Sequence, residues 1–347
     1  MAKVVTLGEI MLRLSPPGYE RFAQASRFDV NYGGAEANVA ASLAQLGNNA
    51  AFLSKIPKNA IGDAAIATLK SLGVNCQYIA RGGKRLGIYF LENGASIRPS
   101  SVVYDRADSS VTQAKATEFD FDKIFNDVDL FHVSGITPVL SQDAADLTLT
   151  ALKKAKEHSV TVSFDLNYRA KLWTDHIEEK QQMLSDMMPY VDICFGNARD
   201  AAKCLGYTEN GMDFINGDYS ICVDETHMTN VMKHYGFTHL ITTLRNSISA
   251  SDNGWSGAIC TDSGLYHGRT YDLHIVDRVG GGDAFAAGVL HGILAEMGDE
   301  KALEFGLAAA AIKHTIPGDL NFYLSRRSSE SDEYRWRRTC SEIIIKS

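Results

Sequence analysis

The feature that most constrains the fold of this chain is a repeated alternation of short apolar runs with segments of helical spacing. Apolar runs occupy residues 4–9, 51–56, 128–133, 160–165, 191–195 and 239–243. Segments with helical spacing occupy residues 35–46, 63–72 and 143–158, and another begins at Ala198. Short apolar runs are typical of buried strands, and a glycine such as Gly47 or Gly73 commonly ends a helix. The alternation predicts an α/β fold in which a mostly parallel sheet carries helices on its faces.

Two stretches interrupt this alternation and predict a separate, smaller β-layer. Residues 87–92 and 101–106 are strand-like and flank a turn at Asn93 and Gly94, a pair typical of hairpins. Residues 11–32 are mixed and polar, which places them outside the main core. We expect the two stretches to form a lid above the α/β sheet. Residues 208–224 are a polar insertion, for which we expect a surface loop.

Composition and charge argue against several classes of partner. The 347 residues carry a net charge of −8 and contain no basic run, so we expect neither a nucleic-acid nor an anionic-membrane partner. The six cysteines form no C-x-x-C motif and are typical of reduced thiols. No apolar run approaches the roughly 20 residues that span a bilayer. Because the first residues enter a strand directly, we expect no signal peptide. We therefore expect a cytoplasmic protein.

The most informative local motif is a run of three glycines, Gly280, Gly281 and Gly282, followed by Asp283 and an apolar helix over residues 284–297. Unpaired amides at a helix N-terminus, together with the helix dipole, form an anion site. Asp283 then places a carboxylate beside that anion. Acidic residues are also favoured in the first turn of any helix, so the motif is equally compatible with ordinary capping. Our hypothesis is phosphoryl transfer in which Asp283 accepts the proton of an attacking hydroxyl.

Polar loops after several predicted strands point to one cleft. These loops are residues 165–169, 196–197 and 243–246, and the glycine run itself follows an apolar segment at 273–276. Ligands of open parallel sheets bind beyond the carboxyl ends of the strands, where such loops meet. Asn38 lies in an otherwise apolar helix, and its buried amide requires hydrogen-bond partners. No P-loop, no dinucleotide-binding fingerprint and no paired-histidine metal motif is present.

Two separated signatures resemble those of the ribokinase-like sugar kinases, most closely the 2-keto-3-deoxygluconate kinases. They are Gly-Gly-Ala-Glu-Ala-Asn-Val-Ala at residues 33–40 and Asp-Arg-Val-Gly-Gly-Gly-Asp at residues 277–283. Subgroup motifs lie at residues 104–110, 165–173, 243–245 and 313–319. The resemblance covers about residues 3–325. It implies a three-layer α/β/α sandwich with a mostly parallel sheet, in a single domain over residues 1–325 with a β-lid from about 11–32 and 86–106. Residues 326–347 fall outside it as a C-terminal tail.

The resemblance also implies roles for individual residues. It makes Asp283 the catalytic base and Gly280, Gly281 and Gly282 the anion hole. It places substrate contacts at Gly34, Asn38, Tyr89, Tyr104, Arg106, Arg169 and Asp283. It places ATP near Asn167, Arg169, Asn197, Thr243, Arg245, Gly280 and Gly282. It further implies Mg²⁺ carried with the nucleotide and a homodimer in which the β-lids of two subunits meet.

The chain departs from the family pattern at two places. The N-x-x-E motif of the family appears as Asn197-Ala198-Arg199-Asp200, and because aspartate is one methylene shorter, we expect Asp200 to contact the metal through water. Arg278 and Gly281 stand where threonine and alanine are commoner. A monovalent-cation (K⁺) site near Asp277 is therefore left open.

A cationic pocket favours an acidic sugar as the acceptor. The carboxylate of a keto-acid is best bound by a bidentate cation, which Arg106 and Arg169 supply. We therefore predict phosphorylation of the 6-hydroxyl of 2-keto-3-deoxygluconate by ATP, with a near-normal pKa at Asp283. The alternatives are a kinase of a neutral sugar such as fructose or ribose, and a non-catalytic sugar-binding regulator.

Overall fold

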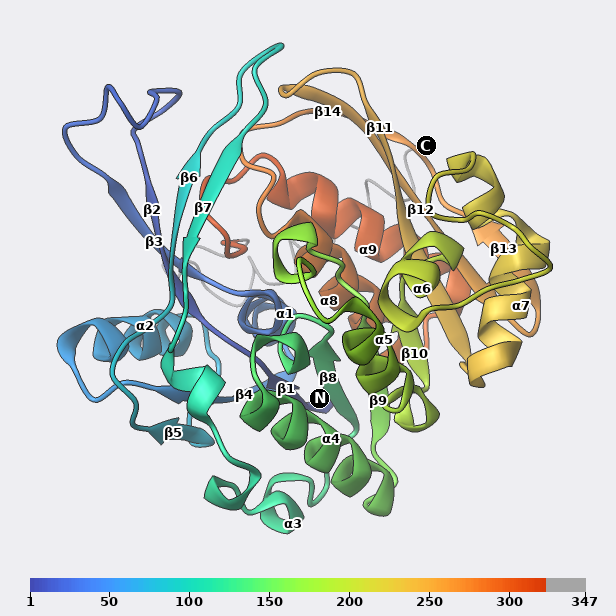
Figure 1. The fold of residues 1–347 in the computed structure, drawn as a ribbon, viewed down its shortest axis with the longest axis horizontal. Coiled ribbons are helices and arrows are strands. Elements are labelled where there is room, and N and C mark those ends of the chain that lie inside the picture. The colour runs from blue at the N-terminus through green and yellow to red at the C-terminus, as the bar shows by residue number, and fades with distance from the viewer. Residues whose placement is uncertain (323–347) are drawn as a thin grey trace.

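A computed structural model describes residues 1–322 of the chain, and a large mixed sheet forms its centre (Figure 1). The strand order is β13-β12-β11-β10-β9-β8-β1-β4-β5, and β14 pairs with β12. These strands are β1 (Lys3–Leu7), β4 (Asn49–Ile56), β5 (Ile79–Arg81), β8 (Leu130–Ser134), β9 (Thr161–Asp165), β10 (Ile193–Phe195), β11 (His239–Ser247), β12 (Asp252–Thr261), β13 (Gly264–His267) and β14 (Tyr271–His274). Pairing is parallel from β5 to β11 and antiparallel from β11 onward.

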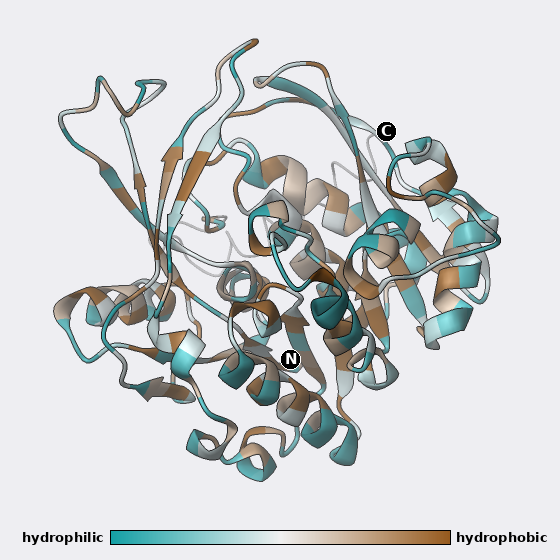
Figure 2. Ribbon diagram, in the orientation of Figure 1, coloured by the Kyte–Doolittle hydropathy of each residue, from teal (hydrophilic) through white to brown (hydrophobic). Residues whose placement is uncertain are grey.

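Helices cover both faces of this sheet. They are α1 (Ala35–Gln45), α2 (Ala60–Ser71), α3 (Phe121–Ile124), α4 (Gln142–Glu157), α5 (Ile177–Ser185), α6 (Ala198–Leu205), α7 (Glu225–Tyr235), α8 (Gly281–Leu294) and α9 (Asp299–Lys313). One core packs α4 to α7 against strand residues such as Val5 and Phe164, and the other packs α1, α8 and α9 against Val4 and Ile241. Successive strand residues thus face opposite layers, and apolar colour gathers on the strands and on the inner helix faces (Figure 2). The predicted three-layer sandwich is confirmed.

The smaller sheet has the order β3-β2-β6-β7 and stands apart from the main sheet. Its strands are β2 (Met11–Ser15), β3 (Asp29–Gly33), β6 (Ile88–Glu92) and β7 (Ser101–Asp105). The tip of the β6–β7 hairpin contacts the β11–β12 turn, where Ala250 N donates to Ser96 O at 2.8 Å and Ser96 N donates to Ser251 Oγ at 3.0 Å. This small sheet therefore arches toward the far edge of the main sheet (Figure 1).

Several element boundaries differ from the sequence-based predictions. Helix α2 begins at Ala60, because Asn59 caps it by accepting a hydrogen bond from Gly62 N at 2.9 Å. The apolar segment at 273–276 forms only the end of an antiparallel edge strand, β14. The insertion at 208–224 is not simply an exposed loop, since it includes a 3-10 turn and buries Phe214 and Cys222 in the core. The predicted tail lies outside the described residues.

A search of residues 1–322 for bilayer-spanning segments finds no helix with the necessary length and apolar character.

Candidate active site

A cavity of about 1010 Å³ lies between the small sheet, the glycine run and the carboxyl ends of β9 to β11. Most of the predicted site residues line it: Gly34, Asn38, Tyr89, Tyr104, Arg106, Asn167, Arg169, Asp200, Thr243, Arg245, Gly280, Gly282 and Asp283. Gly281 and Asn197 are not among its lining residues. Strand ends from one edge of the sheet therefore meet the lid at a single cleft, as the sequence predicted.

Asn197 has a structural role at the start of α6. Its Oδ1 accepts hydrogen bonds from Arg199 N at 2.9 Å and Asp200 N at 3.2 Å, and Asp200 Oδ2 accepts from Asn197 N at 3.2 Å. This reciprocal pairing is a capping box. Asn197 Nδ2 also donates to Thr242 Oγ1 at 3.1 Å. Because its amide is satisfied inside the protein, Asn197 acts by fixing Asp200, which does line the cavity.

Close packing at the glycine run explains two of its three glycines. Gly280 has a φ of 79°, and a Cβ there would lie 2.0 Å from Asp319 O. A Cβ on Gly281 would lie 2.4 Å from the imidazole ring of His314. Around Gly282, by contrast, no heavy atom of residues 1–322 lies within 4 Å of the position of a Cβ, apart from its chain neighbours and the backbone of its own helix. The run thus bends tightly against the segment after α9 and opens toward the cavity at Gly282.

Asp283 is held by the buried Asn38. Asn38 Nδ2 donates to Asp283 Oδ2 at 2.6 Å, and Asn38 Oδ1 accepts from Gly34 N at 3.2 Å. The hydrogen-bond partner that the Asn38 amide was expected to need is therefore Asp283, and the contact joins α1 to α8. Desolvation raises the pKa of Asp283 to about 6, although the Asn38 hydrogen bond opposes the shift. The expectation of a near-normal pKa did not account for this desolvation.

Two further carboxylates lie near Asp283 in the cavity. Desolvation raises the pKa of Asp165 to about 7; the positive charge of Arg169 opposes this, and Asp283 and Asp200 add to it. Desolvation also raises the pKa of Asp200. Three acids and one guanidinium therefore share this end of the cavity, a charge balance that favours binding of a cation.

The lid residues form a chain of aromatic and ionic contacts. The ring centroids of Tyr89 and Tyr104 lie 6.0 Å apart, and the Arg106 guanidinium lies 5.7 Å from the Tyr104 ring. Arg106 is also paired with the buried Glu9, whose Oε2 accepts from Arg106 Nε at 3.0 Å. Arg169 forms no ion pair among residues 1–322, and its Nη1 donates to Tyr168 O at 3.1 Å. Of the two arginines predicted to bind the substrate carboxylate, Arg106 is already ion-paired within the protein and Arg169 is not.

A buried ion cluster that we did not predict joins the lid to the glycine run. Arg13, on β2, donates from Nη2 to Asp277 Oδ2 at 2.7 Å and from Nη1 to Asp319 Oδ2 at 2.9 Å. The Arg13 side chain is 2% exposed, and Asp319 also accepts a hydrogen bond from Tyr89 OH. Burial alone would lower the pKa of Arg13, but Asp319 and Asp277 together raise it. The sequence indicated this cluster only through one charged residue, Arg13, between Leu12 and Leu14 of a strand. In the structure the Arg13 side chain is buried, as are those of Met11 and Ser15 at the alternate positions of β2.

The Arg13 cluster occupies the place near Asp277 where a monovalent-cation site was considered. Asp277 Oδ2 accepts from Arg13 and from Gly318 N at 2.9 Å, and Oδ1 accepts from Val279 N at 3.1 Å. Lys313 is also buried beside the cluster, and burial lowers its pKa. The positive charge next to Asp277 is therefore supplied by the protein, and these residues do not fit a site for an added cation.

Comparison with known proteins identifies relatives that match nearly the whole chain. The sequence model of the pfkB family carbohydrate kinases matches residues 1–323. A 2-dehydro-3-deoxygalactonokinase of Haloferax volcanii is 35% identical over 320 residues, which is 92% of this chain and 93% of that protein. The crystal structure of a 2-dehydro-3-deoxygluconokinase from Thermotoga maritima is 46% identical, with a TM-score of 0.88, 98% of this chain covered and 100% of that one.

A more distant neighbour supports the fold alone. A putative ribokinase II from E. coli, solved in complex with ATP and Mg²⁺, is 18% identical and has a TM-score of 0.78 over 98% of this chain and 100% of its own. The predicted ribokinase-like architecture is confirmed by this likeness.

We predict that Arg13→Met lowers the free energy of unfolding by about 3–5 kcal/mol, because it leaves Asp277 and Asp319 buried without their cation. Urea unfolding followed by circular dichroism measures the change. The matched control is Arg81→Met, which removes a pair with Asp63 whose side chains are 31% and 64% exposed. Equal losses in both variants would contradict a special role for the cluster.

Proposed function

The chain belongs to the pfkB family of carbohydrate kinases, and we propose that it transfers the terminal phosphoryl group of ATP to the 6-hydroxyl of 2-keto-3-deoxygluconate. The observation that carries the proposal is Asp283, a desolvated carboxylate held by Asn38 at the open end of the glycine run. The names of the Thermotoga and Haloferax relatives, both 2-dehydro-3-deoxy sugar-acid kinases, support this substrate class.

In the proposed reaction Asp283 is the general base. Asn38 occupies Oδ2, and among the described residues no further hydrogen bond to the carboxylate is formed, so Oδ1 is free to accept the hydroxyl proton. The sugar oxygen then forms its bond to the terminal phosphorus as the bond to the bridging oxygen breaks. ADP leaves with that oxygen, and the proton remains on Asp283. Positioning and charge stabilisation dominate such a transfer.

The anion hole is provided by the N-terminus of α8. The N-cap residue, Gly280, has no side chain that could satisfy the first amides of this helix. Amides and helix dipole are therefore available to the oxygens of the transferred group, and losing one such donor typically costs roughly 3 kcal/mol.

Mg²⁺ fits the acidic end of the cavity. Asp165 and Asp200 supply the oxygen ligands that this ion prefers, and a bound cation would relieve their raised pKa values. We propose that Asp165 and Asp200 would hold the ion that is carried with ATP; residues 1–322 contain no group of three or more potential metal ligands that would bind it by themselves. When bound with ATP, Mg²⁺ neutralises charge on the phosphates.

We assign the substrate carboxylate chiefly to Arg169. Arg106 already has Glu9 as a partner, whereas Arg169 has no ion pair in the described chain. In this proposal Arg106 and Tyr104 close the lid side of the sugar pocket, beside Tyr89. The Glu9–Arg106 pair is also the observation that favours the alternative, a neutral-sugar kinase, because it leaves less cationic charge for an acid.

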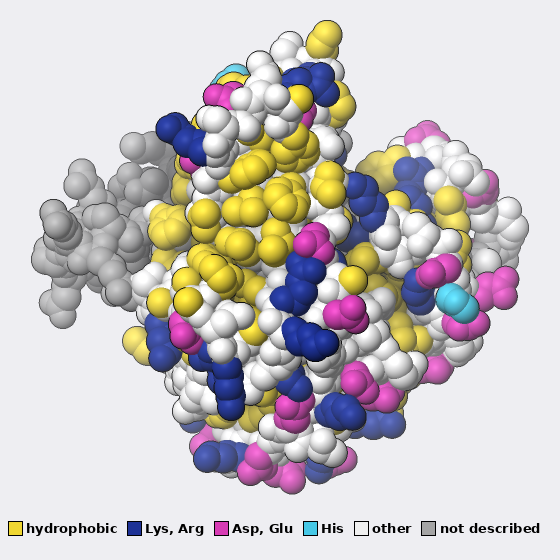
Figure 3. Space-filling model, turned by 60° about the vertical axis from the view of Figure 1, so that its left-hand side comes forward, with side chains coloured by type: hydrophobic (Ala, Val, Ile, Leu, Met, Phe, Trp, Pro, Cys, Tyr) yellow, Lys and Arg dark blue, Asp and Glu magenta, His cyan; other side chains and the backbone are white. Residues whose placement is uncertain are grey.

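We further propose a homodimer formed through the lids. Apolar side chains gather on the lid sheet (Figure 3), where Phe28, Val30 and Val103 are 40%, 58% and 51% exposed. A patch of this kind on the exposed side of a sheet is typical of an interaction surface.

The substrate assignment is tested by measuring ADP release with a panel of acceptors. We expect turnover with 2-keto-3-deoxygluconate or its galacto epimer, and little with fructose or ribose. Arg169→Ala should raise KM for the keto-acid by about ten-fold or more, because a charge-assisted bidentate contact is lost. Arg81→Ala, away from the cavity, is the control. Preference for a neutral sugar, or an unchanged KM in Arg169→Ala, would contradict the assignment.

For the base, we predict that Asp283→Asn loses about 10²–10⁴-fold in kcat, the usual contribution of a positioned base. Calorimetry should still detect binding of ATP and of the sugar acid, because the amide preserves the shape of the side chain. Asp63→Asn, a surface change, should leave kcat as it is. Retained turnover in Asp283→Asn would remove Asp283 from the base role.

The pH dependence follows from the raised pKa of Asp283. The base acts as its carboxylate, so kcat/KM should fall as pH decreases through about 6 and be constant well above it. Asn38→Leu removes the hydrogen bond that lowers this pKa, and should move the midpoint to higher pH. A profile that is flat between pH 5 and 8, or a midpoint unmoved in Asn38→Leu, would argue against Asp283.

A further inference from the structure

We infer that Arg278 and Arg245, which both line the cavity that the glycine run borders, together form a clamp for the terminal phosphates of a nucleoside triphosphate. The inference rests on the proposed function, which supplies the nucleotide. It adds a role for Arg278 in the reaction and identifies which part of the nucleotide the pair recognises.

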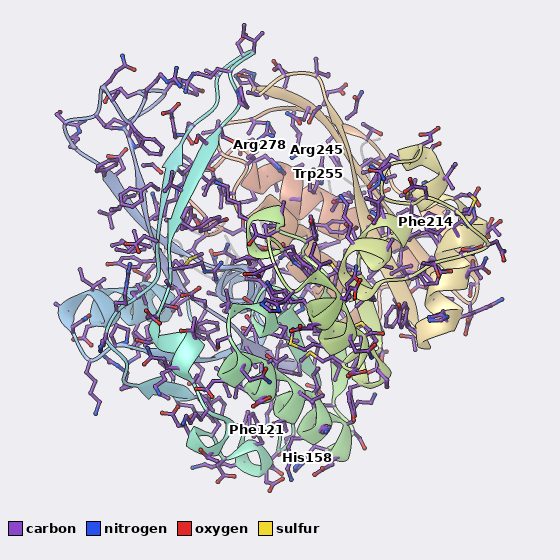
Figure 4. The ribbon with its side chains drawn as sticks, viewed as in Figure 1. Phe121, His158, Phe214, Arg245, Trp255 and Arg278 are labelled. Carbon is purple, nitrogen blue, oxygen red and sulfur yellow. The ribbon has the colours of Figure 1, made fainter. Side chains whose placement is uncertain are left out.

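The fold places the two arginines together from segments distant in sequence. Arg245 lies on β11 directly opposite Trp255 of β12. The Trp255 ring lies 4.8 Å from the ring of His314, centroid to centroid, and His314 O accepts hydrogen bonds from Val276 N at 2.9 Å and Asp277 N at 3.2 Å. The next residue after Asp277 is Arg278. Arg245, Arg278 and Trp255 accordingly lie near one another at the cavity in Figure 4.

The part of the cavity lined by Arg245, Arg278 and Trp255 is rich in hydrogen-bond donors and poor in acceptors. Neither arginine forms an ion pair among residues 1–322, and Arg278 Nη2 donates only to a main-chain oxygen, Ala250 O, at 2.9 Å. Trp255 is 5% exposed, and its Nε1 is buried without an acceptor in the described structure. Buried donors are normally satisfied, so this arrangement points to an absent anionic ligand.

The like charges also affect each other. Burial lowers the pKa of Arg278, and the positive charge of Arg245 lowers it further. Burial lowers the pKa of His314 to about 4, so His314 is neutral and does not compete as a cation. Two guanidinium groups held close together without a carboxylate are stabilised when an anion binds between them.

Phosphate oxygens fit this corner better than the carboxylate of the sugar acid. Arg278 is two residues from Gly280, so the clamp borders the amides that would receive the transferred group. The cation near the acids, Arg169, interacts instead with Asp165, Asp200 and Asp283. A polyphosphate chain carries several charges and offers the planar guanidinium groups bidentate oxygens. Arg245 and Arg278 are therefore assigned to the phosphates of the nucleotide, and Arg169 to the acceptor.

The test measures binding of ATP, ADP and AMP, without sugar, by calorimetry on Arg278→Gln and Arg245→Gln. We expect each variant to weaken ATP binding by about ten-fold or more, ADP less, and AMP less than about two-fold, because only the terminal phosphates are contacted. Arg278→Lys should recover part of the loss, since lysine keeps the charge but not the bidentate geometry. Arg81→Gln is the control.

Two outcomes of these binding measurements would contradict the clamp. Equal weakening of ATP and AMP would show a structural role and overturn the clamp. Unchanged ATP binding with a raised KM for the sugar acid would assign the pair to the carboxylate and also overturn it. Arg245 is exposed, so its variant is expected to fold even if Arg278 variants do not. Because the assay contains no sugar, a selective loss of ATP binding would stand even if the chain phosphorylated a different acceptor.

Discussion

The site depends on one buried ionic interaction, that of Arg13 with Asp277 and Asp319. Arg13 belongs to the small sheet, Asp277 begins the glycine run, and Asp319 follows α9. Asp319 also accepts a hydrogen bond from Tyr89, so the same cluster fixes a lid residue that lines the cavity. Charges this deeply buried are tolerated only when they are fully paired, which makes the position of the lid and the position of the anion hole parts of one arrangement.

The charged residues that line the cavity match the needs of phosphoryl transfer. Asp165 and Asp200 lie near Arg169, whose charge opposes the rise in their pKa values, and they are the residues expected to hold the metal. Arg278 is two residues before Gly280, the N-cap of α8, and Arg245 lines the same cavity. Asp283 has a pKa of about 6, which keeps it ionised at neutral pH yet makes it a stronger base than an exposed aspartate.

Sequence reasoning located most of the residues that line the cavity but did not reveal several of their partners. The buried amide of Asn38 was expected to need a partner, but that partner, Asp283, is 245 residues away and no local pattern indicates it. Asn197, which the resemblance places near ATP, caps α6 in the structure, and a capping box and a ligand-binding motif contain the same residue types. Arg106 was assigned to the substrate and is already paired with Glu9, 97 residues earlier in the chain.

The sequence by itself determined the alternation of strands and helices, the two strand-like stretches of the lid and the glycine run with its acid. Each of these depends on neighbours within a few residues, through apolar periodicity, turn chemistry and the needs of a helix N-terminus. Only the tertiary structure decided which charges meet. Arg13 pairs with residues 264 and 306 positions away, and desolvation inside the cavity raises the pKa of Asp283. Pairing and desolvation depend on the packing of distant segments, which the order of residues along the chain does not display.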